Sequence, residues 1–143
     1  MLIGTFATII LPVSAAMKDE EPVIEDVIAE HLTTIYTTPQ QKLSVMTKKL
    51  DKNGYELWVL PETGEIAFVD KASEQITFSN PWNVAVGTES EDTKKDVMSQ
   101  VFINYNNNGK AATMNSFEEA AQRGQIVVKN IKNGLRVEYN IVR

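Results

Sequence analysis

Three acidic side chains lie close enough in the sequence to act together as the acid and base of a glycosidase. They are Glu62, Glu65 and Asp70, and a pair of carboxylates is the catalytic requirement of most glycosidases. Glu62 falls in a predicted turn, and the other two fall at the ends of a predicted strand, where solvated carboxylates are ordinary. The sequence therefore favours solvated surface positions for these three carboxylates. We predict that the chain has no catalytic residue and no enzyme activity.

The residue counts exclude most other catalytic and metal-binding chemistry. The chain has no cysteine and one histidine, His31, which excludes a thiolate nucleophile, a disulfide scaffold and Cys-ligated or multi-histidine metal centres. A serine nucleophile would have only His31 as its base, and His31 lies on a predicted acidic helix, so a catalytic triad has no support. Asn104–Gly109 is spaced like a calcium loop, but position twelve is Asn115 instead of glutamate. We interpret it as a hairpin turn and expect no metal and no cofactor.

Aromatic side chains gather around the predicted sheet, at Tyr55, Trp58, Phe68, Phe78 and Trp82. Aromatic rings on a sheet can form a sugar-stacking platform, although large aromatic side chains more often belong to a core. Tyr55 and Trp58 fall on opposite faces of one strand, so at most one of them belongs to the core face. We take Trp58 and Trp82 as the candidate carbohydrate contacts.

The charge of the chain is concentrated in one short segment. The 143 residues include 14 Lys and Arg and 19 Asp and Glu, for a net charge of −5, which argues against nucleic-acid binding. Residues 18–31 hold six acidic side chains and one lysine, so they carry the whole net charge, and residues 32–143 are balanced. The acidity therefore does not predict a cationic ligand for the rest of the chain. The length and a hydrophobic content of 43% fit one folded domain.

Residues 1–16 are typical of a secretory signal or an N-terminal anchor. They carry no charged side chain, and either Val13–Ala15 or Ser14–Ala16 fits a small-residue cleavage site. As a helix they would reach only about 24 Å, short of the roughly 30 Å hydrocarbon core, which favours a cleaved signal. No Lys or Arg precedes the apolar run, so a buried N-terminal strand is the alternative. We expect a bacterial extracellular or cell-surface protein that contacts a membrane only through this segment, if it is uncleaved.

Residues 17–38 are predicted to precede the main domain, which we place at residues 39–143. Apolar residues between Val23 and Ile35 recur at helical spacing. This pattern predicts an acidic amphipathic helix over Pro22–Tyr36, and a solvated linker is the equal alternative.

From Leu43 the apolar pattern changes to alternation, which predicts a mainly β domain. The predicted strands are Leu43–Leu50, Tyr55–Leu60, Glu65–Asp70, Ile76–Phe78, Gln100–Tyr105 and Lys110–Met114, with a helical turn at Asp92–Met98. We predict an antiparallel meander and hairpins that form a β-sandwich, which this chain need not complete, together with the N-terminal helix.

Two local signals mark the last part of the domain. Ser116–Glu119 matches a capping box, so a short capped helix is predicted near residues 116–123. Asn133–Gly134 predicts a two-residue hairpin turn, which would place Lys129 opposite Glu138.

Five strings of the domain carry a family resemblance through their order and spacing. They are Tyr55–Trp58, Glu62–Ala67, Phe78–Pro81, Ser116–Ala121 and Gly124–Tyr139. Together they resemble the N-terminal region of a family of large, uncharacterised, secreted proteins of Gram-positive bacteria. Those proteins resemble glycoside hydrolases and carry an N-terminal β-sandwich followed by a glycosidase-like barrel. No single string is diagnostic.

The resemblance implies a non-catalytic, exported accessory β-domain of a glycosidase-like surface protein. Such a domain would support the barrel structurally or make weak carbohydrate contacts. The barrel is absent, so no catalytic residue is carried over to this chain. At Arg143 the family's sandwich is still being built, so the chain looks like a truncated form, a gene fragment or one piece of a split protein. The alternative is a free-standing module that binds a protein partner through an open sheet edge.

Overall fold

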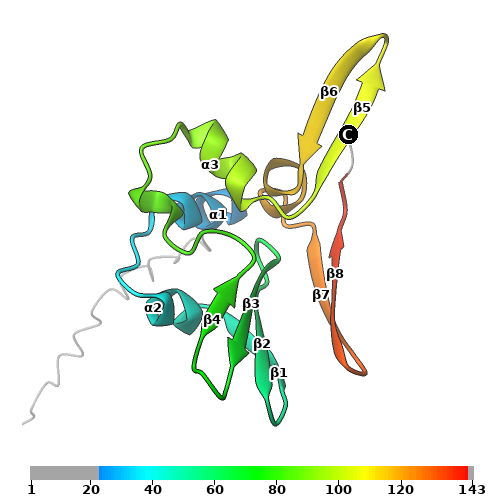
Figure 1. Cartoon of the computed structure of the whole chain (residues 1–143). Coiled ribbons are helices and arrows are strands. Elements are labelled where there is room, and N and C mark those ends of the chain that lie inside the picture. The colour runs from blue at the N-terminus through cyan, green and yellow to red at the C-terminus, as the bar shows by residue number, and fades with distance from the viewer. Residues whose placement is uncertain (1–22, 142–143) are drawn as a thin grey trace, which may run out of the picture.

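The computed structural model describes residues 23–141, so the predicted signal at residues 1–16 lies outside the described residues. The described elements are α1 (Ile24–Thr33), α2 (Pro39–Ser44), β1 (Thr47–Asp51), β2 (Tyr55–Leu60), β3 (Glu65–Asp70), β4 (Ile76–Phe78), η1 (Val84–Val86), α3 (Glu91–Met98), β5 (Phe102–Asn107), β6 (Lys110–Asn115), η2 (Phe117–Ala121), β7 (Ile126–Ile131) and β8 (Gly134–Tyr139) (Figure 1). In this part of the chain, no helix is long and apolar enough to cross a membrane.

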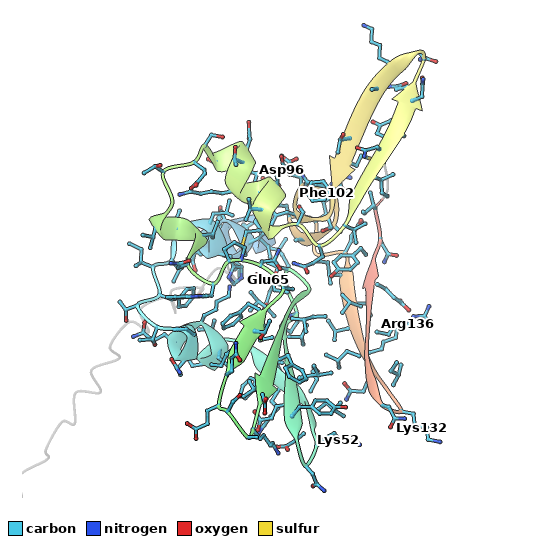
Figure 2. All side chains as sticks on the ribbon, in the orientation of Figure 1. Lys52, Glu65, Asp96, Phe102, Lys132 and Arg136 are labelled. Atoms are coloured by element: carbon cyan, nitrogen blue, oxygen red, sulfur yellow. The ribbon has the colours of Figure 1, made fainter. Side chains whose placement is uncertain are left out.

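The prediction of a mainly β fold built from an antiparallel meander and hairpins is confirmed. Strands β1 to β4 form a four-stranded meander, while β5–β6 and β7–β8 form separate two-stranded hairpins. The β7–β8 hairpin lies beside the meander, and side chains fill the space between them (Figure 2). The Tyr139 hydroxyl of β8 donates a hydrogen bond across this space to the Gly64 carbonyl, at 3.2 Å.

Two small hydrophobic clusters hold these elements together. The first joins α1, α3 and η2 through Ile28, Leu32, Met98, Phe117 and Ala121. The second lies between α2 and the meander and contains Met46, Leu60 and Ala67, with Trp58 among the half-buried side chains around it. The predicted N-terminal helix is therefore present as α1, and it contributes directly to a core.

The predicted strand at Leu43–Leu50 is wrong in its first half, where α2 forms instead. Pro39 occupies the first turn of α2, and the Thr38 hydroxyl accepts a hydrogen bond from the Gln41 amide at 3.2 Å. An N-cap and a proline in the first turn are both strong helix-start signals. They outweigh the alternating pattern, and β1 begins only at Thr47.

The short helix predicted near residues 116–123 is present as η2, but its predicted cap is wrong. The Ser116 hydroxyl accepts hydrogen bonds from the Gln100 and Val101 amides, at 2.9 and 3.1 Å. These bonds fix the position of the segment that precedes β5. The Asn115 side chain takes the capping role, since its carbonyl oxygen accepts from the Glu118 amide at 2.8 Å. Both residues suit a cap, and tertiary contacts decide between them.

The turn of the last hairpin lies one residue earlier than predicted. Residues 132–133 form the turn, so Lys129 pairs with Arg136 instead of Glu138. The pairing slips by two residues, and because side chains alternate with a period of two, each strand keeps its predicted inward face. Lys129 still reaches Glu138 diagonally, at 3.0 Å.

Candidate functional site

Glu65 and Asp70, two of the three carboxylates considered for glycosidase chemistry, do not share one site, whereas Glu62 and Glu65 both lie near His31. Glu65 begins β3 and Asp70 ends it, so the length of the strand separates them. The Asp70 carboxylate accepts the Ala72 amide at 2.8 Å, and this backbone hydrogen bond lowers the pKa of Asp70. It therefore shapes the turn after β3.

The predicted surface position is wrong for Glu65, which is held in a buried ion pair. Its Oε1 lies 3.1 Å from Nζ of Lys42 in α2, and the two side chains are 3% and 1% exposed. Its Oε2 accepts the Thr63 hydroxyl at 2.8 Å. Figure 2 shows Glu65 inside the molecule, at the start of β3. Both carboxylate oxygens of Glu65 are therefore bound, and its charge balances that of the buried lysine.

We call Lys42, Thr63 and Glu65 the buried charged cluster. Two tyrosines, Tyr36 and Tyr139, lie next to it. Nζ of Lys42 lies 5.3 Å from the centre of the Tyr36 ring, a distance that fits a cation–π contact. Burial, and then the negative charge of Glu65, raise the pKa of Tyr139 to about 12. Tyr139 therefore stays protonated and able to donate to the β2–β3 turn.

His31 of α1 faces the same cluster. Its Nε2 is buried and has no hydrogen-bond partner. Burial is the main cause that lowers the pKa of His31, and the positive charge of Lys42 adds to it, while Glu65, Glu62 and Glu30 oppose it. His31 is therefore mainly neutral in the folded protein at neutral pH, and no hydroxyl donates to its Nε2 as the nucleophile of a catalytic triad would.

We expect the free energy of unfolding to fall as the pH drops from about 7 to 5. The folded state resists protonation of His31, so the unfolded state takes up the proton first, from its ordinary pKa of 6.5 downward. Urea denaturation at both pH values measures this loss, and His31→Gln is expected to flatten it. A variant that keeps the full pH dependence of the natural chain would contradict this assignment.

The calcium-like segment forms the hairpin turn that the sequence favoured. Asn108 and Gly109 both have positive φ angles, of 52° and 82°, as a type I′ turn requires. The Asn106 side chain accepts the Gly109 amide at 2.7 Å, so it serves the turn. Among residues 23–141, no three His, Asp or Glu side chains are grouped to hold a metal ion.

The two candidate carbohydrate contacts lie in different settings. Trp58 packs against the second hydrophobic cluster, its indole N–H donates to Glu56 at 2.8 Å, and Lys48 lies 5.5 Å from its ring centre. Trp82 is half-buried in the loop between β4 and η1. The stacked ring pair of the described chain is Tyr55 with Phe68, at 5.4 Å, so the tryptophans do not form a joint platform.

A cavity that the sequence did not reveal lies at the loop that carries Trp82, although Trp82 itself does not line it. It has a volume of about 450 Å³ and is lined by Pro81, Asn83, Val84, Val86, Gly87, Glu89, Lys94 and Val97. We call it the Pro81–Val97 cavity. Val84 and Val86 lie in the 3₁₀ turn η1, and Val97 lies in the short helix α3. Neither element has a regular spacing of apolar residues, so the sequence does not predict this cavity. Val86 and Val97 are 58% and 40% exposed, which leaves an apolar opening at the surface.

The β5–β6 hairpin is a second open surface. It extends away from the other strands, with η2 at its base (Figure 1). The register places Ile103 opposite Met114 and Tyr105 opposite Ala112 on one face. A two-stranded hairpin with an apolar face usually needs a further strand or a covering layer for stability.

Comparison of the chain with protein-family models, curated proteins and solved structures finds no match.

Proposed function

We propose that this chain is a non-catalytic, exported accessory β-domain of a glycosidase-like surface protein, and that it supports a barrel domain by docking. The Pro81–Val97 cavity carries this proposal. Its volume lies in the range of binding pockets, its walls are mainly apolar, and a few polar groups stand among them. The engagement of Glu65 in a buried ion pair further supports a non-catalytic role.

The cavity fits an apolar side chain of a protein partner better than it fits a sugar. No aromatic ring lines it, whereas carbohydrate sites commonly stack a sugar on such a ring. The Lys94 side chain reaches the Ala85 carbonyl at 3.4 Å, so its charge lies beside the apolar opening. The lining also includes the anionic Glu89, so a barrel loop with an apolar side chain flanked by a neutral polar group would complement this surface.

Docking is tested with the separately expressed barrel of a protein from the resembled family. We expect the barrel and this chain to co-elute on size exclusion. Val97→Asp should abolish co-elution, because it places a charge in the apolar opening. Val127→Asp is the matched control, since Val127 is 39% exposed on β7 and Val97 is 40% exposed. Co-elution unchanged by Val97→Asp, or no co-elution of the natural chain, would overturn the docking proposal.

Weak carbohydrate contact is the second form of the accessory role, and Trp82 supports it because its ring is half-buried in a surface loop. Affinity electrophoresis in gels containing soluble polysaccharides tests this role. We expect Trp82→Ala to remove any retardation without unfolding the protein. Trp58→Ala should instead lower the free energy of unfolding by roughly 1–3 kcal/mol, because Trp58 packs against the second hydrophobic cluster. Retardation by the natural chain that survives Trp82→Ala would contradict this assignment.

A separate candidate is a free-standing module that pairs with a protein through an open sheet edge. The β5–β6 hairpin favours it, because β5 and β6 pair only with each other in the described sheets. Strand addition at such an edge gains main-chain hydrogen bonds and side-chain contacts.

A further inference from the structure

The outer strands of the described sheets differ in how well they are protected against pairing. Charged side chains, short length and bulges are the usual protections of an edge strand. Strand β1 has three charged residues and an irregular register, and β4 has only three residues. Strands β6, β7 and β8 each include at least one Lys, Arg or Glu.

Strand β5 lacks all of these protections. Its sequence from Phe102 to Asn107 is six residues long and uncharged, and its pairing with β6 is regular. Phe102 and Ile103 are 49% and 38% exposed. Because β5 carries no charged side chain, two copies of it can pair with no like charges facing each other.

The geometry of the hairpin shows which backbone groups point outward. Asn107 and Lys110 close the two-residue turn, and the closing pair of such a turn exchanges both of its hydrogen bonds. Asn107, Tyr105 and Ile103 therefore direct their N–H and C=O groups toward β6, and the residues between and beyond them direct theirs away from it. These outward residues are Phe102, Asn104 and Asn106.

We propose that β5 pairs in antiparallel orientation with β5 of a second copy of this chain, around a two-fold axis at Asn104. In this register Asn104 faces Asn104 of the copy, and Phe102 faces Asn106, so outward backbone groups meet outward backbone groups. Ile103 then lies opposite Tyr105 of the copy, twice in the dimer. Pairs of an aromatic and a β-branched residue are favourable across antiparallel strands, and a two-fold interface must be self-complementary in this way.

This inference deepens the edge-pairing candidate and rests on it. Pairing of the two copies would join two hairpins into one four-stranded sheet. The apolar faces formed by Ile103, Tyr105, Ala112 and Met114 would become continuous across it. The barrel-docking proposal uses the Pro81–Val97 cavity, so the two can fail separately.

Sedimentation velocity of the full chain over a range of concentrations tests the dimer. The natural chain should form a dimer. Asn104→Pro should be monomeric, because proline removes the outward N–H while leaving the pairing of β5 with β6 intact. Asn104→Ala keeps that N–H and should remain dimeric. A natural chain that is monomeric throughout overturns the proposal, and so does equal dimerisation, or equal loss of the dimer, in both variants.

A second variant decides the question if Asn104→Pro does not fold. Ile103→Lys places like charges at diagonal positions across the two-fold axis and should abolish the dimer. Ile131→Lys is its matched control, since Ile131 is 54% exposed on β7, and it should leave the dimer intact. Circular dichroism checks that both variants are folded. A folded Ile103→Lys variant that dimerises like the natural chain overturns the proposal.

Discussion

Replacing Lys42 with methionine is expected to lower the free energy of unfolding by about 3–5 kcal/mol. Lys42 is the cationic partner of Glu65, and both side chains are almost wholly buried. Without the lysine, Glu65 keeps the Thr63 hydroxyl but must either stay charged in an apolar environment or take up a proton. Urea denaturation at pH 7, followed by circular dichroism, measures the loss.

Lys48→Met provides the matched control for this variant. Lys48 also forms ion pairs, with Asp51 and Glu56, but its side chain is 40% exposed. Water solvates the carboxylates when this lysine is removed, so the effect should be much smaller. The double variant Lys42→Met with Glu65→Leu should recover much of the loss, since no unpaired charge stays buried. Equal effects of Lys42→Met and Lys48→Met would contradict a buried charged cluster.

Replacing Ile28 with alanine is expected to lower the free energy of unfolding by about 2–5 kcal/mol. Ile28 of α1 is fully buried and packs in the first hydrophobic cluster with Met98 and Phe117. Removing its side-chain carbons would leave a cavity where α1, α3 and η2 meet. Thermal and urea denaturation would both detect the change.

Ile35→Ala is the control for Ile28→Ala, because Ile35 lies in the same segment, residues 17–38. Ile35 is 66% exposed, so its loss should change stability by no more than about 0.5 kcal/mol. A loss at Ile28 as small as that at Ile35 would mean that α1 acts as a solvated linker, and would contradict its place in the core.

The strands were predictable because their signals are local. Tyr55–Leu60 and Glu65–Asp70 are rich in aromatic and β-branched residues, and the turn between them ends at Gly64. Gly64 has a φ of +77°, and any side chain there would overlap the Tyr139 ring. A turn that needs glycine and two flanking apolar runs together specify a hairpin.

The errors arise where distant contacts decide between local alternatives. Ser116 and Asn115 could both cap η2, and the Gln100 and Val101 amides, which lie before β5, engage Ser116 instead. Lys42 is buried because Glu65 lies beside it in space. No pattern around residue 42 contains that information, so the sequence alone could not distinguish this lysine from a solvated one.

The candidate surfaces were predictable only in part. The sequence predicted an open edge at the last strand, not at β5, and it singled out Trp82, whose neighbours Pro81 and Asn83 line the Pro81–Val97 cavity. The cavity itself depends on how the loop after β4 returns to α3, where the Asn80 side chain donates to the Val97 carbonyl at 2.9 Å. A contact between residues 17 positions apart has no signature in the spacing of the sequence.

Hydrogen exchange of this chain, with and without the separately expressed barrel of the resembled family, tests the central docking proposal most directly. The amides of the η1–α3 segment, residues 84–98, line or flank the Pro81–Val97 cavity. We expect the barrel to slow their exchange and to leave the amides of β7 unchanged. Unchanged exchange throughout residues 84–98 in the presence of saturating barrel would contradict docking at this cavity.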